Sequence, residues 1–211
     1  MSTIRAVILI AALLVPVSGH AQVCLGFAPG AGPAFLGGFE GTDGHVGWGG
    51  DLTVPVADAS VVLGYRNMEY GLDVARATVV RPLDRPGFPF CLTGGVERIA
   101  RDRDPDTNRS GYTRWRVPLG IALAYRFESG GVHALTAFVN PAVVFAVHRT
   151  ELDSGGELGP DPYIVPGGTA GLTFSVGPVL IRGAVRHALV PEREAAPQHF
   201  PYLTVSLGLG F

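Results

Sequence analysis

The sequence predicts an all-β fold: a closed antiparallel up-and-down transmembrane β-barrel of ten strands, or of eight if the weak first strand is absent. Apolar residues alternate with small or charged ones along most of the chain, the two-residue period of a strand with one apolar face. Glycine and proline number 30 and 17, yet mean hydropathy is +0.29, which favours short apolar strands over disorder. Short connections also alternate with long charged ones, as at the two ends of a transmembrane barrel.

The N-terminus predicts export. A single positive charge within Met1–Arg5 precedes the apolar run Ala6–Val17 and the small residues of Ser18–Ala21. The run is about a dozen residues, too short to span a bilayer, so residues 1–21 are interpreted as a cleaved signal peptide rather than a membrane anchor. A lipoprotein is disfavoured because "AQVC" has no small residue just before the cysteine. We expect a periplasmic segment at 22–30 and the barrel at 31–211.

Turn signals divide the barrel into strands, and no helical period is found in the exported part. The predicted strands are 31–39, 44–56, 60–70, 73–83, 90–101, 112–127, 132–149, 163–176, 179–190 and 201–211. The first is rich in glycine, which leaves eight strands as the alternative. An even number places both termini at the end with short turns, which faces the periplasm.

The two faces of each strand differ in chemistry. On strand 112–127, Leu119 and Ile121 share an apolar face, and Arg116 lies on the other. A soluble sandwich alternates in the same way. In a membrane, however, an arginine facing lipid costs about 2–4 kcal/mol, so the charged face must point into the narrow lumen, which side chains fill. The predicted lumen charge network comprises Asp51, Arg66, Arg76, Glu97, Arg116, Arg126, Arg182 and Arg186.

Aromatic residues near the strand ends predict two belts at the membrane interfaces. The belt at the long-loop end is predicted from Trp48, Tyr70, Tyr112, Trp115, Tyr163 and Tyr202. The belt at the short-turn end is predicted from Phe90, Tyr125, Phe127, Phe174 and Phe211.

The signal peptide, the hairpin rhythm and the ending "YLTVSLGLGF" carry a family resemblance. The chain resembles the small outer-membrane β-barrel proteins of Gram-negative bacteria, the opacity-protein and OmpX-like group. The resemblance implies an outer-membrane monomer in contact with membrane lipid and lipopolysaccharide. It also implies that the last strand carries a signal for the barrel-assembly machinery. That signal would comprise Tyr202, Leu207, Leu209 and Phe211.

The only two cysteines, Cys24 and Cys91, predict a disulfide. Cys24 closely follows the signal peptide, and Cys91 begins a strand beside a periplasmic turn. Both are therefore expected at the same rim of the barrel in an oxidising compartment. The bond would hold the N-terminal segment against the barrel mouth.

Motifs for chemistry are weak. Asp102, Asp104 and Asp106 have the spacing of a calcium loop, but Thr107 and Thr113 stand where glycine and glutamate are needed. The histidines lack zinc-ligand spacing, and no G-x-S-x-G motif is present. We therefore expect no metal, cofactor or catalytic site. A formal net charge of -2 argues against nucleic acid as a partner.

The expected function is a structural or surface-interaction role in the outer membrane, without enzymatic activity. A narrow, anion-leaning, porin-like channel is an alternative because arginines outnumber acids in the predicted lumen. A lipid-modifying hydrolase is another, since His148 or His187 lies near acidic residues. A soluble periplasmic sandwich or lipocalin-like binder would need its apolar face turned inward.

Overall fold

The computed structural model describes residues 24–25, 32–42, 45–83, 90–101, 111–129, 133–151, 157–188 and 202–210. The predicted signal peptide and most of the predicted periplasmic segment lie outside these residues. So does the aspartate-rich stretch 102–110. No helix within these ranges is both long and apolar enough to cross a membrane.

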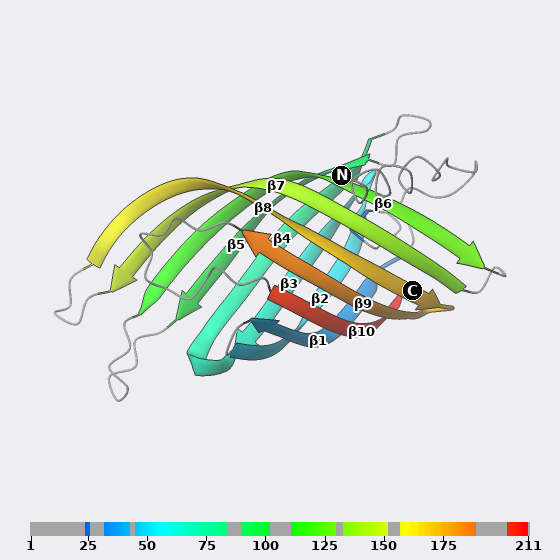
Figure 1. Ribbon diagram of the computed structural model, residues 1–211, viewed down its shortest axis with the longest axis horizontal. Helices are drawn as coiled ribbons and strands as arrows, with labels where there is room; N and C mark the ends of the chain where they lie inside the picture. The colour runs from blue at the N-terminus through cyan, green and yellow to red at the C-terminus, as the bar shows by residue number, and fades with distance from the viewer. Residues whose placement is uncertain are drawn as a thin grey trace, which may run out of the picture.

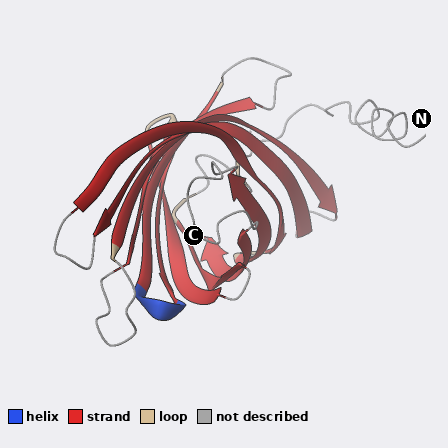
Figure 2. Ribbon diagram, turned by 60° about the vertical axis from the view of Figure 1, so that its left-hand side comes forward, coloured by secondary structure: helices blue, strands red, loops and turns tan. Residues whose placement is uncertain are grey.

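The structure is a single closed barrel of ten antiparallel strands (Figure 1). The strands are β1 Ala34–Thr42, β2 His45–Val56, β3 Ala59–Met68, β4 Leu72–Pro82, β5 Phe90–Arg101, β6 Tyr112–Ser129, β7 His133–Glu151, β8 Glu157–Val176, β9 Val179–Ala188 and β10 Tyr202–Gly210. One 3-10 turn, η1 (Glu69–Gly71), joins β3 to β4 and is drawn in blue in Figure 2. Figure 2 also shows the strands as one continuous ring.

Each strand pairs with its neighbours in the sequence, and β1 pairs with β10 to close the ring. That seam runs from Ala34 opposite Gly210 to Gly41 opposite Leu203. Its glycines allow the two backbones to approach, because a Cβ added at Gly38 would collide with the carbonyl oxygen of Val205. The ten-strand prediction is confirmed, and the eight-strand alternative is wrong.

Two predicted boundaries differ in ways that matter. β1 runs from Ala34 to Thr42 rather than over 31–39, which brings Glu40 into a strand. β8 begins at Glu157 rather than at 163, because pairing with β7 continues through a register shift between His148 and Thr150. The segment predicted as a loop at 150–162 is therefore partly strand.

The barrel has a turn end and a loop end, names used below. At the turn end, two-residue turns at Ala57–Asp58 and Gly177–Pro178 join consecutive strands. Gly177 has a φ of 54°, the left-handed backbone region that glycine adopts readily. β1 begins and β10 finishes at this same end.

The exterior is apolar and the interior is charged. Leu119, Ile121 and Leu207 are 50%, 46% and 61% exposed, whereas Arg66 and Arg116 are 1% and 7% exposed. A soluble sandwich or lipocalin-like barrel buries its apolar face instead, so the soluble alternative is wrong.

The aromatic belt predicted at the loop end is partly wrong. Trp48 and Trp115 face outward, but Tyr112 and Tyr202 pack in an interior cluster with Met68. The prediction considered only how far along its strand each aromatic residue lies, and not which face of the strand it occupies. Tyr112 is at an even position of β6, and the even positions share the inner face with the arginines. Tyr163, on the inner face of β8, also belongs to the interior.

The turn-end belt fits the structure better. Its described members all lie on the outer face: Phe90, Tyr125, Phe127 and Phe174. The rings of Tyr125 and Phe127 pack edge to face with centroids 4.5 Å apart. The side chains of Tyr70 and Phe211 lie outside the described part of the chain.

Candidate functional site: the barrel lumen

Side chains fill the lumen in three layers along the barrel axis. An apolar layer occupies the turn end, an ionic layer the middle, and a second apolar layer the loop end. The layers arise because inward positions of neighbouring strands lie at similar heights, so each layer collects residues from most of the strands.

The turn-end layer is sealed by a disulfide between Cys24 and Cys91, as predicted. The two cysteines are 2% and 0% exposed, and Leu25 beside them is 8% exposed. The bond therefore holds Cys24 and Leu25 in the buried interior of the barrel, rather than at its rim. The apolar residues packed around it are Ala34, Leu36, Val62, Val80, Ala122, Ala124, Phe138 and Ala184.

The middle layer is an alternating chain of buried charges, here called the ion-pair chain. In order of contact it consists of Arg76, Asp51, Arg66, Glu40, Arg186, Glu97 and Arg116. Six of these residues were predicted to face the lumen, and the structure brings them together. Glu40 is the member that the sequence reasoning missed.

Asp51 on β2 holds one end of the ion-pair chain. Its oxygens accept hydrogen bonds from Arg76 Nη2, both at 2.8 Å, and from Arg66 Nη2, also at 2.8 Å. Such two-sided charge-assisted pairing offsets much of the desolvation cost of a carboxylate that is 2% exposed. Gly64 leaves room for this, since a Cβ there would meet both Asp51 and Arg76 side chains.

Arg186 on β9 links the two sides of the lumen. Its Nη2 donates to Glu40 Oε1 at 2.9 Å, and its Nη1 donates to Glu97 Oε2. Glu97 on β5 also accepts from Arg116 Nη1 at 3.4 Å, and Glu40 lies 3.7 Å from Arg66 Nε. Because β9 and β5 are not neighbours in the ring, these contacts cross the lumen.

The other two predicted lumen arginines also face inward but are not members of this chain among the described residues. Arg182 places its guanidinium carbon 4.9 Å from the ring centroid of Phe138, a cation–π contact. Arg126 lies nearer the turn end of β6, opposite the buried Thr136. Arg114, which the sequence reasoning did not single out, is fully buried on the inner face of β6.

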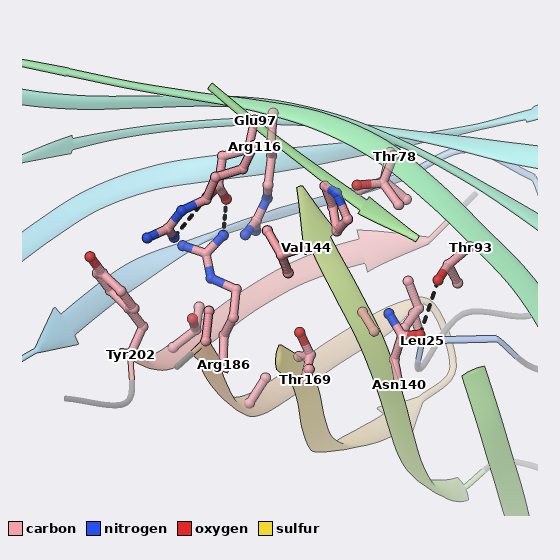
Figure 3. A pocket seen from close by; sticks show the side chains of 18 of the residues that line it. Leu25, Thr78, Thr93, Glu97, Arg116, Asn140, Val144, Thr169, Arg186 and Tyr202 are labelled. Atoms are coloured by element: carbon pink, nitrogen blue, oxygen red, sulfur yellow. Dashed lines mark hydrogen bonds and ion pairs between the residues drawn. The ribbon is translucent and has the colours of Figure 1, made fainter. Parts of the chain in front are cut away.

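Beside the ion-pair chain lies a cavity of about 140 Å³. Ser206 lines this cavity. The charged residues that face it are four arginines and two acids: Arg76, Arg116, Arg182, Arg186, Asp51 and Glu97. Figure 3 shows Arg186 with Glu97 and Arg116 on one side of this space. On the other side of the view, the Thr93 hydroxyl donates to Asn140 Oδ1 at 3.0 Å.

The loop-end layer closes over the ionic layer. Met68, Val74 and Ile99 are each at most 2% exposed and cluster with Tyr202. Tyr112 packs against them, and the guanidinium carbon of Arg101 lies 4.9 Å from the Tyr112 ring centroid. The lumen is thus occupied near both of its ends.

Of the histidines considered for hydrolysis, His148 on β7 lies directly opposite Asp161 on β8. His148 Nε2 forms a 2.8 Å hydrogen bond with Thr150 Oγ1, and its ring lies 5.6 Å from that of Tyr112. His187 lies on β9 opposite Gly168. Within the described ranges, no group of His, Cys, Asp and Glu side chains is arranged to hold a metal ion.

The residues of the predicted assembly signal lie on β10, except for Phe211, which is outside the described residues. Leu207 and Leu209 point outward at 61% and 44% exposure, whereas Tyr202 points inward at 9% exposure. Tyr202 therefore does not share the face of the two leucines.

Comparisons with known proteins show a likeness to solved structures. No family model matches the chain, and no curated protein matches it. Among solved structures, the chain is similar to the crystal structure of Neisserial surface protein A, NspA, with 10% sequence identity and a TM-score of 0.44. The match covers 85% of this chain and 94% of that one. Membership of the opacity-protein and OmpX-like group stays a prediction.

Proposed function

We propose that this chain is an outer-membrane β-barrel protein with a structural or surface-interaction role and a closed lumen. The observation that carries the proposal is the ion-pair chain, which crosses the lumen between two apolar layers. A barrel built for free passage of solutes would leave a continuous aqueous path instead. Here the path is interrupted by side chains that are held by buried ion pairs.

The chemistry of the exterior supports the outer membrane as the location. Aliphatic and aromatic residues cover the outer face of every strand, and a closed ring leaves no strand edge in hydrocarbon. The same exterior in water would be a very large apolar surface, which soluble monomers avoid.

Heat-modifiable gel migration and membrane fractionation test this location. We expect the expressed protein to sediment with outer membranes, to need detergent for extraction, and to migrate faster on a gel before boiling than after. Recovery in the soluble periplasmic fraction without detergent would contradict the proposal.

A narrow anion-leaning channel is the second candidate, favoured by the four arginines that face the cavity. Planar-bilayer recordings separate the two. The closed-lumen proposal gives no stepwise conductance for the purified protein, whereas steady, anion-selective steps would favour the channel.

The exterior near the loop end offers a surface for lipopolysaccharide. Arg98 and Arg149 are exposed there, on the outer faces of β5 and β7, with Trp115 of β6 opposite Arg98. The two arginines are separated by two strand spacings, about 10 Å across the sheet. Arginines at this level can bind the phosphates of an anionic glycolipid, and tryptophan favours the interface.

The proposal includes no catalytic role. A hydrolase acting on lipid would place a nucleophile and a base within hydrogen-bond reach. If the chain has no such activity, the lipid A mass spectrum of cells that express it will match that of cells carrying the empty vector. A reproducible loss of an acyl chain in expressing cells would favour the hydrolase alternative instead.

Recognition by the barrel-assembly machinery is proposed for the last strand. Removing Phe211, or replacing Leu209 with asparagine, is expected to leave more protein unfolded in the periplasm. A folded fraction equal to that of the unmodified chain would argue against this signal.

A further inference from the structure

We propose that the outer wall of the barrel binds one lipopolysaccharide molecule in a fixed orientation, with an acyl chain in a groove over β1 to β3. The inference rests on the proposed function and deepens it, because it assigns a place on the protein to the hydrocarbon part of the glycolipid. Three features support it: the shape of the groove, two charged side chains that do not pair with each other, and the depth of each part.

The groove exists because two outward-facing positions of neighbouring strands are glycine. Gly37 on β1 lies directly opposite Gly50 on β2, so no side chain covers the backbone there. The groove measures about 710 Å³, and its apolar walls are Phe35, Phe39, Trp48, Leu52, Leu63 and Tyr65. Phe39 and Trp48 are 65% and 63% exposed. A flexible hydrocarbon chain fits an apolar groove of this kind, whereas a polar group would lose hydrogen bonds in it.

A carboxylate with one free oxygen lies beside the Tyr65 wall of the groove. The Tyr65 hydroxyl donates to Asp73 Oδ1 at 2.7 Å, and Asn67 Nδ2 donates to the same oxygen at 2.9 Å. These bonds hold the carboxylate of Asp73, on β4, toward β3. Its second oxygen, Oδ2, has no hydrogen-bond partner in the described part of the chain. A hydroxyl group of a ligand can therefore donate to it.

Arg98 on β5 supplies the complementary charge. It is the diagonal neighbour of Asp73, and Ala75 lies between Tyr65 and Arg98 in one cross-strand row. Diagonal neighbours are about 7–8 Å apart. No ion pair joins Asp73 to Arg98 in the described structure, because the carboxylate is bonded toward β3. A phosphorylated sugar binds both groups at once, with its phosphate at the guanidinium and a hydroxyl at the carboxylate.

The polar and apolar parts lie at the depths that an amphiphile requires. Asp73 is the second residue of β4 counted from the loop end, and Gly50 is the sixth residue of β2. At about 3.4 Å per residue, Gly50 is therefore about 14 Å deeper along its strand than Asp73 is along its own. In the proposed function the loop end faces the cell exterior, so lipopolysaccharide is the phosphorylated amphiphile at this level. A second copy of the chain in the groove would leave Asp73 and Arg98 without a ligand.

Native mass spectrometry of the full chain in detergent, titrated with purified lipid A, tests the groove. We expect one lipid A per chain to persist at collision energies that remove phosphatidylethanolamine. Gly37→Leu fills the groove and is expected to weaken the apparent lipid A affinity about tenfold. The strand tolerates this change, since a Cβ at Gly37 would meet no atom closer than 3.6 Å. Gly183→Leu is the control, because Gly183 on β9 is also an outer-face glycine and a Cβ there has no atom within 4 Å.

The polar contacts are tested by Arg98→Gln and Asp73→Asn. Each is expected to weaken the apparent lipid A affinity about tenfold, since each removes a hydrogen bond in which one partner is charged. Arg81→Gln, at an exposed arginine near the turn end, should leave the affinity unchanged. Heat-modifiable migration of every variant is measured first. Asp73→Asn keeps the size and shape of the side chain, so it tests the site even where another variant does not fold.

Three results would overturn the site. They are equal lipid A binding by Gly37→Leu and Gly183→Leu, equal retention of lipid A and phosphatidylethanolamine, and a dimer that Gly37→Leu dissociates. Gly37→Leu leaves Arg98 and Arg149 in place, so it separates the groove from general attraction of lipopolysaccharide to the arginines. Recovery in the soluble fraction would contradict the proposed function as well. A barrel that sediments with outer membranes but binds lipid A equally in all variants would contradict this site alone.

Discussion

At the scale of single residues, Arg186 is the cation of the ion-pair chain that joins Glu40 on β1 to Glu97 on β5. It pairs with Glu40 and Glu97, and these acids pair in turn with Arg66 and Arg116. Because the chain alternates and finishes in arginine at both ends, each acid lies between two cations. Loss of an acid therefore leaves two buried cations adjacent to each other, whereas loss of a terminal arginine leaves one acid with a remaining partner.

Glu97→Gln tests this difference. We expect it to lower the free energy of unfolding by about 3–5 kcal/mol, because Arg116 and Arg186 lose a buried carboxylate. The measurement is reversible urea unfolding in lipid vesicles. Arg81→Gln is the control, since Arg81 pairs with Asp58 at an exposed surface and such pairs contribute about 0–1 kcal/mol. Equal effects of the two substitutions would argue against a structural role for the ion-pair chain.

Residue identity predicted which way most charged side chains face, but not their partners. The two-residue period placed Arg66, Arg116 and Arg186 inside because an arginine in lipid is costly. The pairing of Arg186 with Glu97 depends on the stagger of strands across the lumen, which local patterns do not encode. Glu40 was missed because "GGFEGT" has weak alternation, and its strand is defined by pairing with β2 and β10 rather than by the local pattern.

At the scale of elements, the order of strands in the ring could be predicted from the alternation of short and long connections, but the residues at which strands begin and end could not. Short turns made consecutive pairing the simplest arrangement, and the structure has that arrangement. β8 extends beyond its predicted start because its pairing with β7 continues through a register shift to Glu151 opposite Glu157, despite two prolines in the added segment. The predicted aromatic belt was wrong where only the position along the strand was considered and not the face, as for Tyr112, which lies in the interior.

The outer face of β10 gives a depth-dependent prediction. Leu207→Arg is expected to lower the free energy of unfolding in bilayers by about 2–4 kcal/mol, since Leu207 lies near the middle of the strand. Leu203→Arg, near the loop end, should cost less because arginine there reaches the interface. Urea titrations in the same lipid compare the two. A larger cost at Leu203 would contradict the proposed placement of the barrel in the membrane.

The disulfide gives a second prediction at this scale. Cys24 and Cys91 are 67 positions apart, and cross-links over loops of this length stabilise by about 4 kcal/mol in the chain-entropy view. Cys24→Ser is expected to lower the free energy of unfolding by a similar amount. Unfolding of the oxidised and reduced unmodified protein should differ in the same way, and no difference in either comparison would show that the bond contributes little.

At the scale of the whole molecule, closure removes every strand edge among the described strands. Edges are the usual route by which β proteins associate, so a closed ring favours the single chain as the folded unit. The apolar exterior is then expected to be covered by lipid or detergent.

A monomer is therefore expected in detergent. Analytical ultracentrifugation with density matching of the detergent should give a mass near 22.1 kDa, less the signal peptide. A mass of two chains would contradict this expectation. The apolar groove over the glycines of β1 and β2, between Phe39 and Leu52, would then be the first candidate for a contact between copies.

The cross-link has a further consequence for biogenesis. Between Cys24 and Cys91 lie all of β1 to β4, so oxidation in the periplasm ties these four strands into one loop. If the disulfide forms before insertion, β1 to β4 must enter the bilayer together, because the two ends of this segment are covalently linked. β10 lies outside the cross-linked loop. The last step of barrel assembly is then the pairing of this free C-terminal strand with strands that have already assembled.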